Sequence, residues 1–231
     1  FTLISKFIPR KVVFRTGGDV LWELYTERTK KKVLLRDFYN TELSQLSLKE
    51  KLIFYLMKWT LRNLSAVIWS TGWQKNIFMK PYNLFGQKHF VIENYYGFKE
   101  DDLKPDLKIF MASARNLFLK NIDVLRRVFE RIKDSEVRLF TENLKYQDFT
   151  EKIKKSYAVV QLSLSEVSPN MILDAIRYNR PFICTREVGI FDRIKDAGIF
   201  VDPLNENEIE KAILTLLDKN EYEKARRKVR E

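Results

Sequence analysis

Cysteine and histidine are almost absent from this sequence. The one cysteine, Cys184, lies within an apolar segment and has no partner for an intrachain disulfide, which excludes a disulfide-stapled fold and suits a reducing cytosol. We expect this thiol to pack in a core. The one histidine, His89, has no second histidine or cysteine at ligand spacing, which disfavours a zinc site.

Long apolar runs are also missing. No uninterrupted stretch reaches the length of a membrane-spanning helix, and no secretory signal peptide is evident, which favours a cytoplasmic protein. Residues 1–9 lack an initiating Met and resemble the tail of a helix, while residues 11–15 resemble a strand from the middle of a sheet. We therefore expect the first half of an N-terminal domain to be absent from this sequence.

What the sequence does contain is apolar material and positive charge. With 231 residues, 45% of them hydrophobic, the chain can bury a sizeable core and form two modest domains. The net charge is +11 and the isoelectric point is near 9.6. Such a balance favours acidic partners, namely nucleotides, anionic lipid or nucleic acid.

The apolar pattern is interrupted between residues 96 and 106, where Gly97, an acidic pair and Pro105 occur. After this break, short apolar runs alternate with segments of helical spacing, which predicts a parallel, doubly wound sheet. The predicted strands are 107–113, 136–141, 157–162, 181–185 and 199–202. The predicted helices are 121–132, 148–155, 169–178, 190–196 and 206–217. Before the break we expect strands 11–15, 66–70 and 89–92 and a helix over 48–64.

The segment from Ser163 to Pro181 is the most informative of the chain. A strand leads into a polar turn with Glu166, and Ser168 followed by proline predicts the N-cap and first residue of a helix. The free N–H groups of Asn170 and Met171 at this helix start would suit a phosphate, while Asp174 lies about one turn further along. The alternative is an ordinary helix cap, in which the acids only interact favourably with the helix dipole.

Cations follow the first strand of the second region. Arg115 and Lys120 come after the strand over 107–113, and Thr185 ends the strand over 181–185. Parallel sheets bind ligands at the carboxyl ends of their strands, where Arg115, Glu166 and Thr185 all fall. Two fixed cations would stabilise the negative charge that grows on a departing phosphate.

These motifs resemble those of a known enzyme family. The Glu166–Asp174 spacing is similar to the Glu-x7-Glu signature of retaining, nucleotide-sugar-dependent glycosyltransferases of the GT-B fold, family four (glycosyl transferases group 1). The strand at 181–185, the turn at 188–190 and the segment 198–203 continue the resemblance, which extends over about residues 106–217. It implies an α/β protein with two Rossmann-like, doubly wound domains facing a cleft. We expect a partial acceptor-side domain over 1–100 and a donor-binding domain over 101–231.

The resemblance also implies a role for each motif residue. Arg115 and Lys120 would hold the donor diphosphate, Glu166 would bind the donor sugar and Asp174 the ribose. The helix start with Ser168, Asn170 and Met171, together with Thr185, would support the phosphate or sugar. The donor would be a nucleoside-diphosphate sugar and the acceptor a glycan or a lipid-linked molecule. No metal or other cofactor is expected, because no Asp-x-Asp follows a strand in this region.

On the acceptor side, a Gly-Gly-Asp turn follows the first predicted strand. The segment from Gly18 to Glu23 resembles the Gly-Asp-x-x-Trp-Glu found in some members of the family, where it lies near the acceptor. Gly18, Asp19 and Glu23 are therefore candidate acceptor-site residues. An ordinary turn is the alternative.

The predicted helix over 48–64 is basic and amphipathic. Lys51, Lys58 and Arg62 share one face, and the apolar residues include Leu52, Leu56 and Trp59. Such a helix can lie on an anionic membrane, which would place the protein at the inner face of the membrane. A Rossmann helix with a solvated charged face is the alternative.

Three positions depart from the family pattern. Asp174 replaces a glutamate, and the glycines that usually follow two of the strands are replaced in Thr141–Lys145 and Arg186–Gly189. Larger residues there would reshape the donor site, so an inactive homologue stays an alternative. A basic nucleic-acid-binding module is another, but no recognition motif occurs and the basic residues are spread along the chain.

Overall fold

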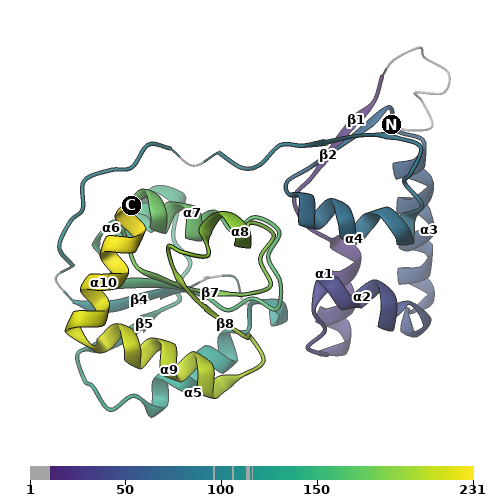
Figure 1. Cartoon of the computed structure of the whole chain (residues 1–231). Helices are drawn as coiled ribbons and strands as arrows, with labels where there is room; N and C mark the ends of the chain where they lie inside the picture. The colour runs from purple at the N-terminus through teal and green to yellow at the C-terminus, as the bar shows by residue number, and fades with distance from the viewer. Residues whose placement is uncertain (1–10, 96, 106, 113–114, 116) are drawn as a thin grey trace. The chain divides into compact units, whose positions relative to one another are not determined.

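A computed structural model describes residues 11–95, 97–105, 107–112, 115 and 117–231. The chain forms two compact units, Phe1–Asn94 and Tyr95–Glu231, each built on a parallel sheet (Figure 1). The expected α/β class is thus confirmed. The contacts divide the chain between Asn94 and Tyr95, whereas the sequence pattern puts the domain boundary at 100/101. Glu100 belongs to the second unit because its carboxylate pairs there with Arg177 and Lys154.

The second unit has a five-stranded sheet in the order β5-β4-β6-β7-β8, with every neighbouring pair parallel. The strand order changes direction between β4 and β6, which makes the carboxyl ends of these two strands a topological switch point. The strands are β4 (Lys108–Ala112), β5 (Val137–Phe140), β6 (Ala158–Gln161), β7 (Phe182–Thr185) and β8 (Ile199–Val201).

Helices cover both faces of this sheet (Figure 1). One core cluster joins the sheet to α5, α9 and Tyr222 of α10, and a second joins it mainly to α6, α7 and α8. The four positions of α9 with helical spacing, Ile209, Ala212, Ile213 and Leu216, are buried as the sequence predicts. The helices are α5 (Ile122–Arg131), α6 (Tyr146–Lys155), α7 (Asn170–Arg177), α8 (Phe191–Ile194), α9 (Glu206–Leu217) and α10 (Lys219–Arg230).

The first unit has a three-stranded parallel sheet in the order β1-β2-β3. Its strands are β1 (Val13–Thr16), β2 (Ala66–Trp69) and β3 (Lys88–Val91), and its helices are α1 (Val20–Thr29), α2 (Leu35–Thr41), α3 (Leu48–Arg62) and α4 (Gly72–Tyr82). An aromatic core of Phe38, Trp69, Phe78 and Tyr82 joins the sheet to the helices.

The helix α3 begins at Leu48 because Ser47 and Glu50 form a reciprocal capping box. The side of α3 that faces solvent is more apolar than the exposed face of an ordinary charged surface helix. Five large residues spaced along one side of the helix are 37% to 87% exposed, and we call them the apolar face of α3: Leu48, Leu52, Tyr55, Leu56 and Trp59.

Candidate functional site

The candidate site lies at the carboxyl ends of β4, β6 and β7. The chain leaves β4 and forms a short 3-10 turn over Phe118–Lys120, while the chain leaving β6 runs toward Glu166. The N–H of Leu164 donates to the carbonyl of Leu119 at 2.8 Å. This single backbone contact joins the two segments and brings Lys120 and Glu166 together at the switch point of the sheet.

Lys120 and Glu166 form an ion pair between their side chains. The two side chains are only 7% and 14% exposed, so that water screens the pair weakly. The hydroxyl of Ser163 donates to the same carboxylate oxygen, Oε1 of Glu166, at 2.6 Å. The structure thus unites two of the predicted donor-site residues and fixes the carboxylate from two sides.

The backbone of Glu166 is held just as firmly. Its N–H donates to the carbonyl of Glu187 and its carbonyl accepts from the N–H of Gly189, each at 2.8 Å. The Arg186–Gly189 segment is therefore the loop that positions Glu166. Thr185 is fully buried, and its hydroxyl accepts from the N–H of Glu187 at 3.1 Å. Its contribution is to hold this turn.

The helix after Glu166 starts one residue later than predicted. Pro169 is the N-cap and Asn170 the first helical residue, and no side chain caps the helix. The predicted cap by Ser168 is therefore wrong, because Pro169 itself takes the extended backbone of the cap. The N–H of Met171 has no acceptor among the described residues, as expected for the first turn of a helix.

Asp174 projects from α7 and is half-buried. Burial raises the pKa of its carboxyl, and the charge of Arg177 partly opposes this shift. Within the described part of the chain, no hydrogen bond or ion pair occupies the Asp174 carboxylate. A half-buried acid of this kind is available to accept hydrogen bonds from a ligand.

Arg115 is exposed, and its neighbours 113, 114 and 116 lie outside the described residues. Its carbonyl accepts from the N–H of Leu117 at 2.9 Å, but no side-chain contact with Lys120 or Glu166 is present in the described region. Its role at the diphosphate stays a prediction.

The Gly18–Glu23 segment of the first unit caps the helix α1. Asp19 is the N-cap and its carboxylate accepts from the N–H of Trp22 at 3.0 Å. The hydroxyl of Tyr39 donates to the same carboxylate at 2.5 Å, and Asp19 is only 1% exposed. The Asp19 side chain thus faces inward. Glu23 is half-buried, and the carbonyl of Gly18 accepts a hydrogen bond from the side chain of Gln74.

Sequence reasoning missed three residues that organise these sites. Ser163 fixes the Glu166 carboxylate, and its position at a strand end was a usable signal. Gln74 is fully buried and bonds both Gly18 and Ser70. Tyr39 reaches Asp19 from twenty residues away, and only the tertiary fold brings that pair together.

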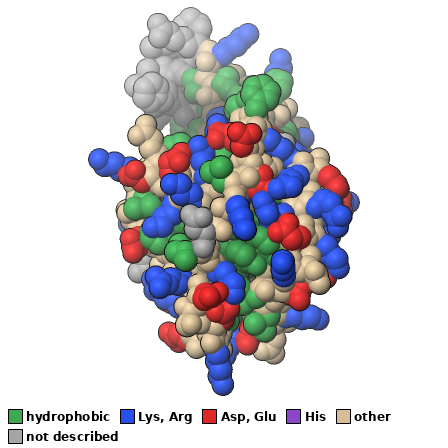
Figure 2. Space-filling model, turned by 90° about the vertical axis from the view of Figure 1, so that its left-hand side faces the viewer, with side chains coloured by type: hydrophobic (Ala, Val, Ile, Leu, Met, Phe, Trp, Pro, Cys, Tyr) green, Lys and Arg blue, Asp and Glu red, His purple; other side chains and the backbone are tan. Residues whose placement is uncertain are grey.

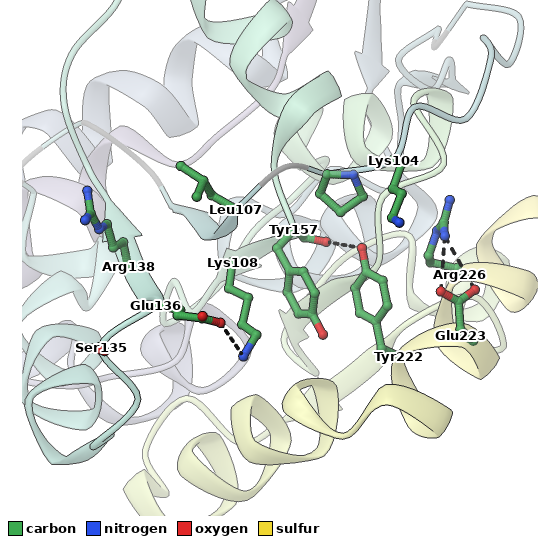
Figure 3. A pocket seen from close by; sticks show the side chains of 11 residues that line it. Lys104, Leu107, Lys108, Ser135, Glu136, Arg138, Tyr157, Tyr222, Glu223 and Arg226 are labelled. Carbon is green, nitrogen blue, oxygen red and sulfur yellow. Dashed lines mark hydrogen bonds and ion pairs between the residues drawn. The ribbon is translucent and has the colours of Figure 1, made fainter.

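A separate cavity of about 450 Å³ lies at the amino ends of β4 and β5, so at the opposite edge of the sheet from Lys120 and Glu166 (Figure 3). Its aromatic wall is formed by Tyr157 and Tyr222, which stack with ring centroids 3.9 Å apart. Lys108 at its rim pairs with Glu136. The cavity holds none of the predicted site residues.

On the face seen in Figure 2, Lys and Arg side chains are interspersed with Asp and Glu. Among the residues that the structure describes, no three His, Cys, Asp or Glu side chains gather where they could hold a metal ion. Nor does any helix of that part have both the length and the hydropathy needed to cross a bilayer.

No known family profile matches the sequence, and no curated protein matches it either. Solved structures do match the fold. Sucrose-phosphate synthase from Thermosynechococcus elongatus is 14% identical with a TM-score of 0.66, and the match covers 99% of this chain and 66% of that chain. HepE from Anabaena, in complex with UDP and glucose, is 12% identical with a TM-score of 0.66, covering 99% and 67%.

WaaG, a glycosyltransferase involved in lipopolysaccharide biosynthesis, is 12% identical with a TM-score of 0.65, and the match covers 94% of this chain and 69% of that chain. These neighbours are glycosyltransferases of the GT-B fold, so the predicted fold is confirmed. This chain spans about two thirds of their length.

Proposed function

We propose that this chain is the donor-binding part, with a portion of the acceptor-binding part, of a retaining glycosyltransferase that uses a nucleoside-diphosphate sugar. The observation that carries this proposal is the enclosed cluster of Lys120, Glu166 and Ser163 at the switch point of a parallel sheet. Parallel doubly wound sheets bind nucleotides at that position. The GT-B fold, and a neighbour solved with UDP-glucose, support the same class of donor.

The donor would rearrange the cluster on binding. In the structure the Lys120 ammonium pairs with the Glu166 carboxylate. A diphosphate would take over Lys120, aided by Arg115 and the N-terminus of α7, and Glu166 would then be released to accept hydrogen bonds from the sugar. Asp174 lies one helical turn along α7 and would accept from the ribose. These residues would do so without a metal ion.

Catalysis would rest on the same contacts. As the bond between the sugar and the diphosphate breaks, negative charge grows on the departing phosphate, and cations fixed by the fold stabilise it without reorganisation. Ser163 and the 187–189 backbone would keep Glu166 in place against the sugar. The acceptor would be a glycan or lipid-linked molecule bound by the first unit, which holds the candidate residues Gly18 and Glu23.

The apolar face of α3 favours an anionic membrane as a further partner. Lys51, Lys58 and Arg62 lie on the same helix as this face, the combination of apolar surface and positive charge that binds anionic lipid. The protein would then work in the cytoplasm at the inner face of the membrane. The mixed charge in Figure 2 favours a glycosyltransferase over a nucleic-acid-binding protein.

The experiment that tests the function is calorimetry with uridine, guanosine and adenosine diphosphates and the matching monophosphates. One diphosphate should bind more tightly than its monophosphate, and Lys120→Gln should reduce this difference by about 1.5–3 kcal/mol, the worth of a hydrogen bond to a charged group. Lys133→Gln, an exposed cation of the same unit, is the control. Equal binding of every pair would contradict the proposal.

Turnover separates an enzyme from an inactive homologue. Glu166→Gln should not weaken diphosphate binding, since it removes the residue that competes for Lys120, yet it should lower sugar transfer by roughly one to three orders of magnitude. Glu130→Gln, which changes an exposed acid of α5, should leave both unchanged. Unaltered transfer by the Glu166→Gln protein would overturn the catalytic assignment.

A further inference from the structure

A groove lies between α2 and α4 of the first unit. It encloses about 640 Å³, a size typical of small-molecule sites. Trp73, Asn76 and Lys80 line it from one side of α4, and Arg36, Tyr39 and Asn40 from one side of α2. The helix α4 follows directly on β2 through the N-cap Thr71. Trp73, the second residue of α4, lines the groove, so one of its walls starts four residues after the end of β2.

The chemistry of the lining residues is that of a carbohydrate site. The half-buried indole of Trp73 offers an apolar ring face to a sugar, and the side chains of Asn40 and Asn76 offer both hydrogen-bond donors and acceptors for hydroxyl groups. No described residue makes a hydrogen bond with the side chain of Trp73, Asn40 or Asn76. These polar groups are therefore available to a ligand.

The charge of the groove is of one sign. Lys80 and Arg36 line it, and no aspartate or glutamate does so among the described residues. Lys80 makes no ion pair in that part of the chain, whereas Arg36 lies 3.6 Å from Asp37, which is outside the groove. Two cations beside neutral hydrogen-bonding groups favour a ligand that combines a sugar with a negative charge.

Both walls of the groove are tied to the Gly18–Asp19 turn. Gln74 of α4 donates to the carbonyl of Gly18 at 3.2 Å, and Tyr39 of α2 donates to the carboxylate of Asp19 at 2.5 Å. The Gly18–Asp19 turn, which resembles an acceptor motif, is thus linked to the groove through the two helices. Asp19 is too buried to meet a ligand itself, but it fixes the side chain of Tyr39, which lines the groove.

We infer that the α2–α4 groove binds an acidic glycan, a sugar that carries a phosphate or a carboxylate, with its ring against Trp73 and its acid group at Lys80. This inference rests on the proposed function and deepens it, because it gives the acceptor a chemical class. The hydroxyls would bond to Asn40 and Asn76. A neutral sugar would lose the contact with Lys80, and inorganic phosphate would lose the contact with the indole.

The test is saturation-transfer NMR on the whole chain with glucose 6-phosphate, glucuronic acid, glucose and inorganic phosphate as probes, without any nucleotide. We expect at least one of the two acidic sugars to bind, and to bind more tightly than glucose or phosphate. The acidic sugar that binds identifies the group, phosphate or carboxylate. Lys80→Gln should weaken that binding about tenfold, as expected for a charge-assisted hydrogen bond. Lys75→Gln, on α4 but outside the groove, is the matched control.

A second pair of variants tests the ring. Trp73→Ala should abolish the saturation transfer, while Trp73→Phe, which keeps an aromatic face and guards against a folding defect, should retain most of it. The inference is overturned if neither acidic sugar binds, or if binding is the same in the Lys80→Gln and Lys75→Gln proteins. If an acidic sugar binds but no nucleotide does, the proposed function is contradicted, while the assignment of the groove as a binding site for an acidic sugar still holds.

Discussion

Asp19 shows how much a single buried side chain can do in this fold. Its carboxylate caps α1, accepts a hydrogen bond from Tyr39 and is almost completely buried. Burial raises the pKa of Asp19 from 3.8 to about 6, against the hydrogen bonds from Tyr39 and the backbone that lower it. Between these two values the folded chain binds more protons than the unfolded chain, so that this group lowers stability as the pH rises through that range.

Asp19→Asn should remove that pH dependence. The amide is neutral and its oxygen can still cap the helix. Between about pH 4 and pH 7, the free energy of unfolding of the original protein should fall by roughly 2–3 kcal/mol relative to the variant, the worth of two pKa units. Denaturant unfolding at several pH values measures this difference. Asp101→Asn, which changes an exposed acid, is the control: its free energy of unfolding should vary with pH as that of the original protein does. If Asp19→Asn also shows the pH dependence of the original protein, the Asp19 carboxyl titrates normally and the prediction is wrong.

The resemblance singled out Lys120 and Glu166 as candidate donor-site residues, but not the contact between them. Glu166 and Lys120 were predicted as donor-site residues, yet their ion pair joins positions 46 apart in sequence and depends on how the turns after β4 and β6 meet. The buried positions of Asp19 and Thr185 likewise follow from the tertiary fold. The residue types carry chemistry, whereas the pairing of side chains is set by packing.

At the scale of elements, strong periodicity made the second unit predictable. All five of its strands and five of its helices lie within about two residues of the predicted bounds. The charged sequence over 221–231 predicts a solvated helix end, but in the structure it belongs to α10, which buries Tyr222 and Val229. Two apolar positions seven apart were too sparse a pattern to predict that packing.

Three helices of the first unit were not predicted. In α1 the apolar residues Val20 and Leu24 are exposed while others are buried, which hides the helical period. The helix α2 has only seven residues. Proline is unfavourable inside a helix, and Pro81 lies in the last turn of α4, where it removes just one hydrogen bond near the helix end.

The helix α3 should carry the protein to anionic membranes. Co-sedimentation with vesicles rich in phosphatidylglycerol should exceed that with phosphatidylcholine vesicles and should fall as salt rises. Changing Lys51, Lys58 and Arg62 together to Gln should lower the partition coefficient by about two orders of magnitude at low salt, since each basic residue contributes about 1 kcal/mol. Leu52→Ser with Leu56→Ser should lower it without altering the salt dependence.

The control for α3 changes the same charge elsewhere. Lys133, Lys195 and Lys211 are exposed cations of the second unit, and their joint change to Gln keeps the net charge of the variant equal to that of the α3 variant. If both triple variants sediment alike, the attraction is a property of the net charge and α3 is an ordinary solvated helix.

At the scale of the whole molecule, the two proposed binding sites lie in different units. Every described residue proposed to hold the donor belongs to Tyr95–Glu231, and the α2–α4 groove belongs entirely to Phe1–Asn94. Each unit has its own sheet and its own hydrophobic core. The sequence indicated this division from the break in the apolar pattern near 96–106, although not the residue at which it occurs.

Because the described residues proposed to hold the donor all lie in one unit, a nucleoside diphosphate that binds, with UDP as the first choice from a structural neighbour, should protect only that unit from hydrogen exchange. We expect slower exchange in peptides that cover 117–122, 163–174 and 185–189, where ordering by the ligand adds to local stability. Peptides from α2 and α4 should be unchanged by UDP and should slow only when the acidic sugar that binds the groove is added. Mass spectrometry on the intact chain measures both effects, and Lys120→Gln should reduce the response to UDP alone. Protection by UDP that is as strong in α2 and α4 as at 163–174 would show that the units do not bind their ligands separately.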